Sequence, residues 1–295
     1  MQAATKPAWA AAGVSKTATT TTTTTAPTAA AAAAATTSHG NSDLRLRAAT
    51  AADLDDIVRI VKAGFPDDPE WDYRYPYRDE YPEDYDYWMR REYGDYLAQT
   101  DKFAVVVATL PELAAASSPS EQIGECGTRD VPVAVAVWDV AVTKDSRGDL
   151  GIGERKDANT VHMLALLHAF TAAARRYFSR HWERQYHLWA LVTHPDYRRR
   201  GAGTALVRWG TRAAREKGGW AASVIASSPA GKRLYAYCGF EELGEVVVQI
   251  EGEEEKCVVW CMDWVLPKVE EEEEEVNGDW MEKKLGNTDR FLPDT

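Results

Sequence analysis

Apolar positions follow two alternating periods along the central part of the chain, and each period predicts one kind of element. The apolar residues of 54–61 recur at helical spacing, which predicts a helix from the N-cap Thr50 to Ala63. Runs rich in β-branched residues at 103–110 and 131–140 predict strands. The same criteria predict strands at 44–48, 186–193, 220–226, 245–250 and 256–266, and helices at 82–100, 160–182, 201–217 and 231–237.

The order of these elements indicates an α/β layer fold that ends in a hairpin turning at 251–253. Residues 66–82 are rich in Asp, Tyr and Pro and predict a loop, as do the segment between the strands at 103–110 and 131–140 and most of 142–158. We therefore expect one domain over 43–267.

Both ends of the chain have a composition unlike that of the centre. Residues 1–42 contain a run of Thr at 19–25 and a run of Ala at 29–35, and residues 268–295 contain six successive Glu at 270–275. Such segments have too few large apolar groups, or too much like charge, to offset the entropy cost of ordering. We expect a disordered Ala/Thr-rich tail over 1–42 and an acidic, largely disordered tail over 268–295.

The charge balance bears on the class of partner. The 295 residues carry a formal net charge of -12, which argues against a general nucleic-acid binder because phosphate contacts need clustered Lys and Arg. The short cluster Arg198–Arg200 is the exception. An acidic body with a small basic region suits an anionic cofactor and a cationic second substrate.

The sequence gives few signals of location. The chain has no run of 18 apolar residues, and its N-terminal Ala runs are broken by Thr, Lys and Pro, so we expect neither a membrane span nor a secretory signal. The absence of acidic residues before Asp43 permits an organellar transit peptide, but that stretch has no Arg. Cys126, Cys238, Cys257 and Cys261 show no C-x-x-C spacing, and reduced cysteines are expected, with a disulfide or a metal pair at Cys257 and Cys261 as the alternative. We expect a cytoplasmic protein, with nuclear and organellar locations as alternatives.

The strongest chemical signal is a strand that runs into a glycine turn and then a helix. The segment 188–206 reads LWALVTHPDYRRRGAGTAL and contains R-x-x-G-x-G at 198–203. Glycines let the backbone approach a ligand, and free N–H groups at a helix N-terminus bind anions. The G-x-G-x-x-G dinucleotide pattern and the G-K-[ST] of a P-loop are both absent. The segment therefore predicts a pyrophosphate site, with a purely geometric glycine turn as the alternative.

A second segment, 228–240, follows after one helix and one strand and reads SPAGKRLYAYCGF. The order R-x-x-G-x-G, helix, strand, L-Y-x-x-x-G-F resembles the GNAT acetyltransferase superfamily, and 44–53 resembles that family's first strand and helix. The resemblance covers about 43–267. It implies a mixed, mainly antiparallel sheet flanked by helices, with a splayed strand pair at the acyl-CoA site. The helix before the motif strand and the start of that strand, His187-Leu188-Trp189, look like the puromycin-type small-molecule branch.

The resemblance also implies roles for individual residues. The pantetheine arm of acetyl-CoA would pair with the backbone of Leu191, Val192 and Thr193. The pyrophosphate would be held around Arg198, Arg199, Arg200, Gly201, Ala202, Gly203 and Thr204. Tyr235 stands where the family often has a general acid for the departing thiolate, which a phenol can protonate. A core aromatic is the alternative for Tyr235, and Tyr237 is a substitute on another face of the helix.

Two positions depart from the family pattern. Many relatives have an Asn before the short helix, whereas this chain has Ser227, Ser228 and Pro229. The strand at 131–140 has no Glu, and its one carboxylate is Asp139. A protonated amine must lose a proton before it attacks, so Asp139 is a candidate base through water, with a structural turn residue as the alternative.

The predicted loop after the first helix mixes acids with aromatics, from Asp67 through Trp71 to Trp88. In the family this segment borders the acceptor site, so a cationic amine is expected there, with a solvated acidic loop as the alternative. The resemblance implies an acetyl-CoA:amine N-acetyltransferase that works by direct attack and without a metal. A non-catalytic acyl-CoA-binding domain and a protein lysine or N-terminal acetyltransferase are the alternatives.

Overall fold

The computed structural model of the chain describes residues 43–113, 128–141, 151–181 and 183–265. The two predicted tails and Cys126 lie outside these residues, as does a large part of the predicted loops before 131 and after 142. The fold below therefore concerns the domain predicted at 43–267.

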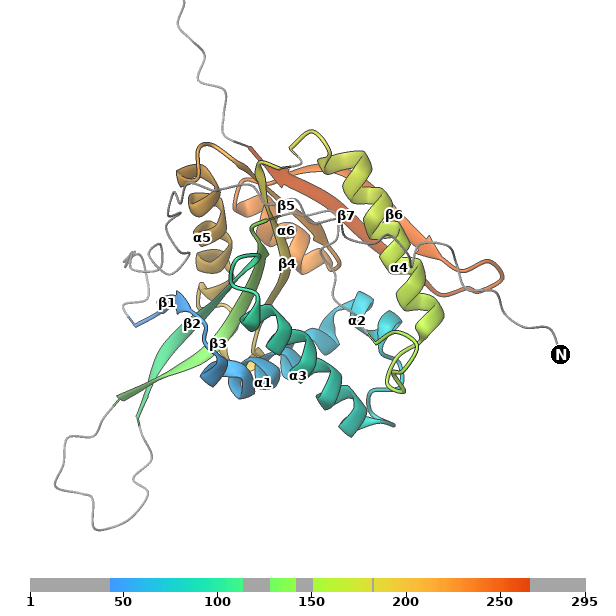
Figure 1. The fold of residues 1–295 in the computed structure, drawn as a ribbon, viewed down its shortest axis with the longest axis horizontal. Coiled ribbons are helices and arrows are strands. Elements are labelled where there is room, and N and C mark those ends of the chain that lie inside the picture. Colours follow the sequence, from blue (N-terminus) through green and yellow to red (C-terminus); the bar gives the residue numbers. More distant parts are fainter. Residues whose placement is uncertain (1–42, 114–127, 142–150, 182, 266–295) are drawn as a thin grey trace, which may run out of the picture.

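A seven-stranded sheet forms the centre of the described chain, in the order β1-β2-β3-β4-β5-β7-β6 (Figure 1). Its neighbours are antiparallel except for β4 and β5, which are parallel. The strands are β1 Arg45–Ala48, β2 Phe103–Leu113, β3 Thr128–Asp139, β4 Gln185–Thr193, β5 Ala221–Ala226, β6 Glu241–Gln249 and β7 Lys256–Trp264. The expected mixed, mainly antiparallel sheet is thus confirmed.

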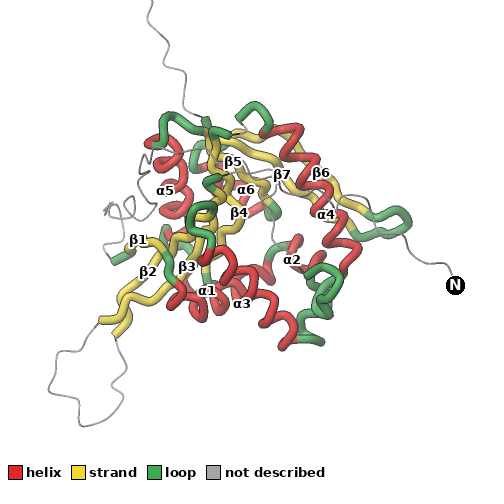
Figure 2. Tube along the Cα trace, in the orientation of Figure 1, coloured by secondary structure: helices red, strands yellow, loops and turns green. Residues whose placement is uncertain are grey.

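Helices cover both faces of this sheet (Figure 2). α1 and α3 lie against one face of β2–β4 and α5 against the other, while α4 contacts β6 and α2 contacts β7. The helices are α1 Leu54–Gly64, α2 Pro69–Arg74, α3 Pro82–Ala98, α4 Thr160–Ala173, α5 Ala202–Glu216 and α6 Pro229–Tyr237. No helix in the described ranges is long and apolar enough to span a membrane.

The alternation along β2 and β3 explains why the sheet has two apolar faces. Odd-numbered valines of both strands pack with α1 and α3, and the even-numbered residues pack with α5. The second face is built mostly of alanine, which lets α5 approach closely. Gly210 of α5 lies directly on the buried ring of Trp138, so that a Cβ there would be 2.1 Å from a ring carbon.

The structure corrects two of the predicted elements. The segment 66–82 is not all loop, because it contains α2, whose N-cap Asp68 accepts a hydrogen bond from the Glu70 amide and whose first residue is Pro69. Asp68 and Pro69 occupy the N-cap and first position of this helix, where both residue types are favoured. The α-helix expected over 160–182 ends at Ala173 and continues as one π-helical turn, Ala174–Phe178.

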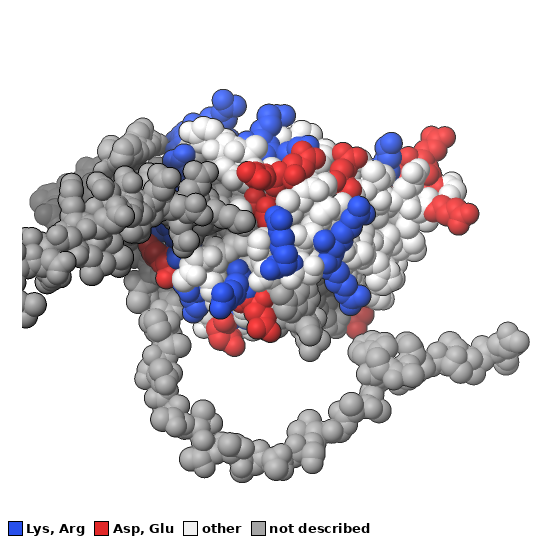
Figure 3. Space-filling view, turned by 90° about the horizontal axis from the view of Figure 1, so that it is seen from above, with Lys and Arg blue, Asp and Glu red and all other residues white. Residues whose placement is uncertain are grey.

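Other local signals behave as expected. Thr50 caps the short helical turn Ala51–Asp53 that leads into α1, and its capping-box partner is Asp53. Cys257 and Cys261 are buried on one face of β7 and are free thiols. On the face drawn in Figure 3, basic and acidic side chains of the described residues are interspersed, so neither sign dominates it.

Candidate functional site

Strands β4 and β5 separate halfway along their length. Their parallel pairing runs from Gln185 and Ala221 to Leu188 and Val224, and then stops although both strands continue. On its other edge β4 pairs with β3, and Trp189 of β4 has no partner in this register. Val137 pairs with Ala190, and the next residue, Trp138, pairs with Leu188. A bulge of this kind bends a strand and increases its twist. The backbone of β4 beyond Leu188 therefore borders a gap instead of β5.

The gap is part of a cleft of about 760 Å³. One wall, which we call the α5 side, is formed by the turn before α5, the start of α5, and α6. The other wall, the α2 side, is formed by the end of α1, the connector to α2, and α2 with part of α3. Among the lining residues are Gly64, Phe65, Asp67, Asp68, Glu70, Trp71, Arg74, Tyr93, Leu191, Val192, Thr193, Arg198, Arg199, Gly201, Ala202, Gly203, Thr204, Ser227, Ser228 and Tyr235.

The start of α5 presents free amides to the cleft. Gly201 is its N-cap, with φ 86°, and its first helical hydrogen bond runs from the Ala205 amide to the Gly201 carbonyl at 2.9 Å. The amides of Ala202, Gly203 and Thr204 precede that bond and therefore have no acceptor within the helix. Arg199 has a positive φ of 64°, which turns the chain sharply before the helix. This arrangement is an anion site of the kind expected from R-x-x-G-x-G.

The three arginines of the turn do not act as one cluster. Arg199 lines the cleft. The guanidinium of Arg200 lies over the Tyr197 ring at 5.2 Å and donates to the Asp196 carbonyl, outside the residues that line the cleft. Arg198 donates instead to the Asp67 carboxylate and to two backbone carbonyls. The three positive charges that are adjacent in the sequence therefore lie in three different surroundings in the structure.

Tyr235 faces the cleft from α6. Its side chain is buried, and this burial, together with the nearby charge of Asp68, raises the pKa of the phenol above its usual value. Gly231 leaves room beside it, since a Cβ there would be 3.4 Å from the Tyr235 ring. Tyr237, the alternative acid, is 70% exposed at the rim with Arg208 over its ring. The geometry favours Tyr235 as the phenol that can protonate a group inside the cleft.

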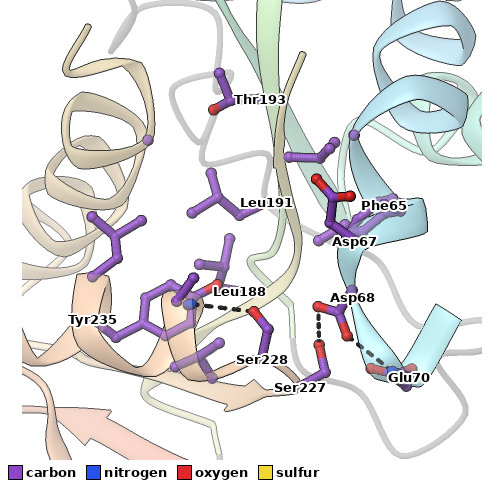
Figure 4. Close-up of a pocket in the computed structure, with 18 of the residues that line it drawn as sticks. Phe65, Asp67, Asp68, Glu70, Leu188, Leu191, Thr193, Ser227, Ser228 and Tyr235 are labelled. Atoms are coloured by element: carbon purple, nitrogen blue, oxygen red, sulfur yellow. Dashed lines mark hydrogen bonds between the residues drawn. The ribbon is translucent and has the colours of Figure 1, made fainter. Parts of the chain in front are cut away.

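Asp68 faces the cleft from the opposite wall (Figure 4). One carboxylate oxygen accepts from the Ser227 hydroxyl at 2.7 Å and the other from the Glu70 amide at 3.0 Å. Burial, followed by repulsion from Glu70, raises the pKa of Asp68 to about 6. A carboxyl with a pKa of about 6 is ionised at neutral pH and still basic enough to accept a proton.

Sequence reasoning did not single out Asp68 as a base. The available signal was the Asp-Pro helix start inside an acidic, aromatic segment, but the contact with Ser227 spans 159 positions and cannot be read from spacing. Asp139 is placed differently. It is buried at the end of β3, accepts from the Ala141 amide at 3.1 Å, and is not among the residues that line the cleft. Its role as a base stays a prediction.

The acids of the α2 side are mostly matched by cations. Asp67 pairs with Arg198, and Glu70 pairs with Arg74 at 3.1 Å. The Arg74 guanidinium lies 4.9 Å from the rings of both Trp71 and Tyr75. Within the part of the chain that the structure describes, Asp68 and Glu92, which also lines the cleft, are not in such ion pairs, so both carboxylates can attract a cation.

Comparison with known proteins agrees with this architecture. The model of the acetyltransferase (GNAT) family matches residues 162–240. An acetyltransferase of Stachybotrys chartarum is 27% identical over 212 residues, which are 70% of this chain and 85% of that protein. The crystal structure of arylalkylamine N-acetyltransferase 2 from Aedes aegypti superposes with a TM-score of 0.51 at 11% identity, covering 76% of this chain and 99% of that one. That superposition shows a shared fold.

Proposed function

Starting from the fact that this chain belongs to the GNAT acetyltransferase superfamily, we propose that it transfers the acetyl group of acetyl-CoA to an amine by direct attack. The observation that carries the proposal is the open N-terminus of α5 beside the separated strands β4 and β5. A diphosphate fits the free amides, and an extended amide-bearing arm fits the exposed strand edge.

The residues expected to hold acetyl-CoA come from the turn and from β4. The amides of Ala202, Gly203 and Thr204 would bind the pyrophosphate, and the Arg199 side chain would add positive charge at the cleft. Gly203 has to remain small, because a Cβ there would already be 3.2 Å from Leu234. When bound, acetyl-CoA supplies an activated thioester. The protein's part is to hold that thioester and the amine at reacting distance.

The acceptor amine would enter along the α2 side. A cationic amine is attracted by the carboxylate of Asp68 and by the ring of Tyr93, which lines the same wall. Asp68 takes one proton from the ammonium group, and the neutral nitrogen attacks the thioester carbonyl carbon. The C–N bond forms and the C–S bond breaks. Tyr235 donates its proton to the departing sulfur and regains one from the nitrogen, which loses its second proton as the amide forms. The proton on Asp68 returns to solvent.

The serine pair at the end of β5 lies between these two groups (Figure 4). Ser227 donates to Asp68, and the Ser228 hydroxyl accepts from the Gly231 amide at the start of α6, which carries Tyr235. These serines stand where many relatives have an Asn. The short side chains leave space for the thioester between base and acid.

The test is acetyl-CoA turnover with a panel of amines, followed as acetylated product by mass spectrometry. The panel contains small cationic amines, a neutral amine, a lysine peptide and a peptide with a free N-terminus. We expect turnover with cationic amines. Binding of CoA without turnover on any acceptor would instead favour a non-catalytic acyl-CoA-binding domain, and absence of CoA binding would remove the proposal.

The variants Asp68→Asn and Asp139→Asn separate the two base candidates. We expect Asp68→Asn to lose about a hundredfold in kcat/KM or more, which is within the usual range for a general base. Asp139→Asn should retain most of the activity. The reverse pattern would return the base to the position predicted from the sequence.

A further inference from the structure

Each of the three side-chain nitrogens of Arg198 donates a hydrogen bond to a protein oxygen. Its Nη1 donates to the Asp67 carboxylate, its Nη2 to the Gly64 carbonyl at 2.8 Å, and its Nε to the Thr193 carbonyl at 3.3 Å. The guanidinium thus joins three segments: the end of β4, the end of α1 and the connector to α2. These acceptors fix the orientation of its planar fork and leave one N–H on each Nη for any other partner.

The end of α1 packs closely against the end of β4 at Gly64. A Cβ on Gly64 would be 2.4 Å from the Val192 side chain and 2.9 Å from the Thr193 carbonyl oxygen. Only glycine fits at that distance. The close fit brings the Gly64 carbonyl within reach of Arg198, which is anchored in the turn that follows β4.

The connector held by Arg198 carries Asp68. Asp67 binds Arg198, and the next residue, Asp68, binds Ser227 and caps α2 through the Glu70 amide. Figure 4 shows Asp67 and Asp68 on the same connector, beside β4. Two successive residues thus hold the connector: Asp67 binds the turn before α5, and Asp68 binds Ser227 at the end of β5. Loss of the Arg198 contact would remove one of these two attachments of the connector.

We propose that Arg198 is a positioning residue, which holds Asp68 at the acceptor site, and that its side chain is not a phosphate ligand. The inference rests on the proposed function, because Asp68 is its proton acceptor. It assigns the binding of the pyrophosphate to the amides of α5 and to Arg199. The Arg198–Asp67 pair is partly solvated, with side chains 38% and 68% exposed, so it contributes little to global stability.

The test compares Arg198→Gln with Asp67→Asn, which removes the charge of the same contact from its other end without touching the turn. Calorimetry gives the Kd for acetyl-CoA, and steady-state kinetics at saturating acetyl-CoA give kcat and KM for the amine. Arg45→Gln is the matched control, because it removes another exposed Arg–Asp pair, with Asp130, away from the cleft.

We expect both variants to bind acetyl-CoA within about threefold of the wild type and to lose about tenfold to a hundredfold in kcat/KM for the amine, as misplaced catalytic groups do. The acid limb of the pH profile should also shift, because the surroundings of Asp68 change. The double variant should be no worse than Arg198→Gln, which already removes the contact with Asp67 along with those to the Gly64 and Thr193 carbonyls.

Two results would overturn the inference. A Kd for acetyl-CoA raised tenfold or more in Arg198→Gln, with kcat unchanged at saturation, would make the side chain a phosphate ligand. Additive losses in the double variant would show that the two residues do not act as a unit. If Arg198→Gln does not fold, Asp67→Asn decides the question alone by its kcat/KM and pH profile. Wild-type protein inactive on every amine would instead remove the proposed function.

Discussion

Replacing Asp68 by asparagine should make the protein more stable at neutral pH while it removes the base. Burial raises the pKa of Asp68 from 3.8 to about 6 in the folded protein. A pKa raised on folding means that the folded protein binds the proton more tightly than the unfolded chain does. The associated stability is fully present below pH 3.8 and is lost as the pH rises through about 6.

The size of the effect follows from the shift. A difference of about 2 pKa units, at about 1.36 kcal/mol per unit, gives up to about 3 kcal/mol of stability lost between pH 4 and pH 7. Asparagine carries no charge to desolvate, and it caps a helix as well as aspartate does. The free energy of unfolding of Asp68→Asn should therefore exceed that of the wild type by up to about 3 kcal/mol at pH 8, and by much less at pH 4.5.

Urea denaturation of both proteins across this pH range measures the difference directly. Other titrating groups act on both proteins alike and cancel in the comparison. Asp95→Asn is the control, because it removes an exposed carboxylate on α3 that does not line the cleft. A stability difference between Asp68→Asn and the wild type that stays constant from pH 4.5 to pH 8 would refute the raised pKa.

As the proposed base, Asp68 should also set the pH dependence of catalysis. Wild-type kcat/KM should rise through an apparent pKa near 6, because the base must be ionised, and this break should be missing in Asp68→Asn. The ionisation of the amine itself lies near pH 10 and cannot produce a break at 6. If kcat/KM of Asp68→Asn showed the same break near pH 6 as the wild type, the break would belong to another group.

Three further expectations follow from the close contacts around the cleft. Gly203→Val should weaken acetyl-CoA binding at least tenfold in calorimetry, because even a Cβ would lie 3.2 Å from Leu234 beside the free amides. Tyr235→Phe should lower kcat about a hundredfold with the Kd for acetyl-CoA retained, as loss of a general acid does, and an unchanged kcat would make Tyr235 a packing residue. Gly210→Ala should destabilise the protein by about 1–3 kcal/mol in thermal unfolding, because its Cβ would overlap the Trp138 ring.

The features that could be predicted from the sequence are those in which a residue acts on its own backbone. The valines of β2 and β3 give the sheet through their period of two, and Thr50 starts the first helix through its cap. Gly201 adopts the left-handed conformation that the R-x-x-G-x-G turn needs, so the anion site could be placed before the fold was known. Such effects depend on a few neighbouring positions and carry over directly from sequence to structure.

The features that could not be predicted depend on partners far along the chain. Arg198 meets Asp67 across 131 positions and Gly64 across 134, and Asp68 meets Ser227 across 159. Spacing gives no access to such contacts, so three adjacent arginines predict one basic cluster, and Asp139 is the candidate base because it is the one carboxylate on the strand where some relatives place a base. Whether an ionisable group is functional depends on its burial and its partners. The backbone of the turn therefore forms the proposed cofactor site, whereas the proposed chemistry at the acceptor depends on how α1, α2 and the end of β5 meet.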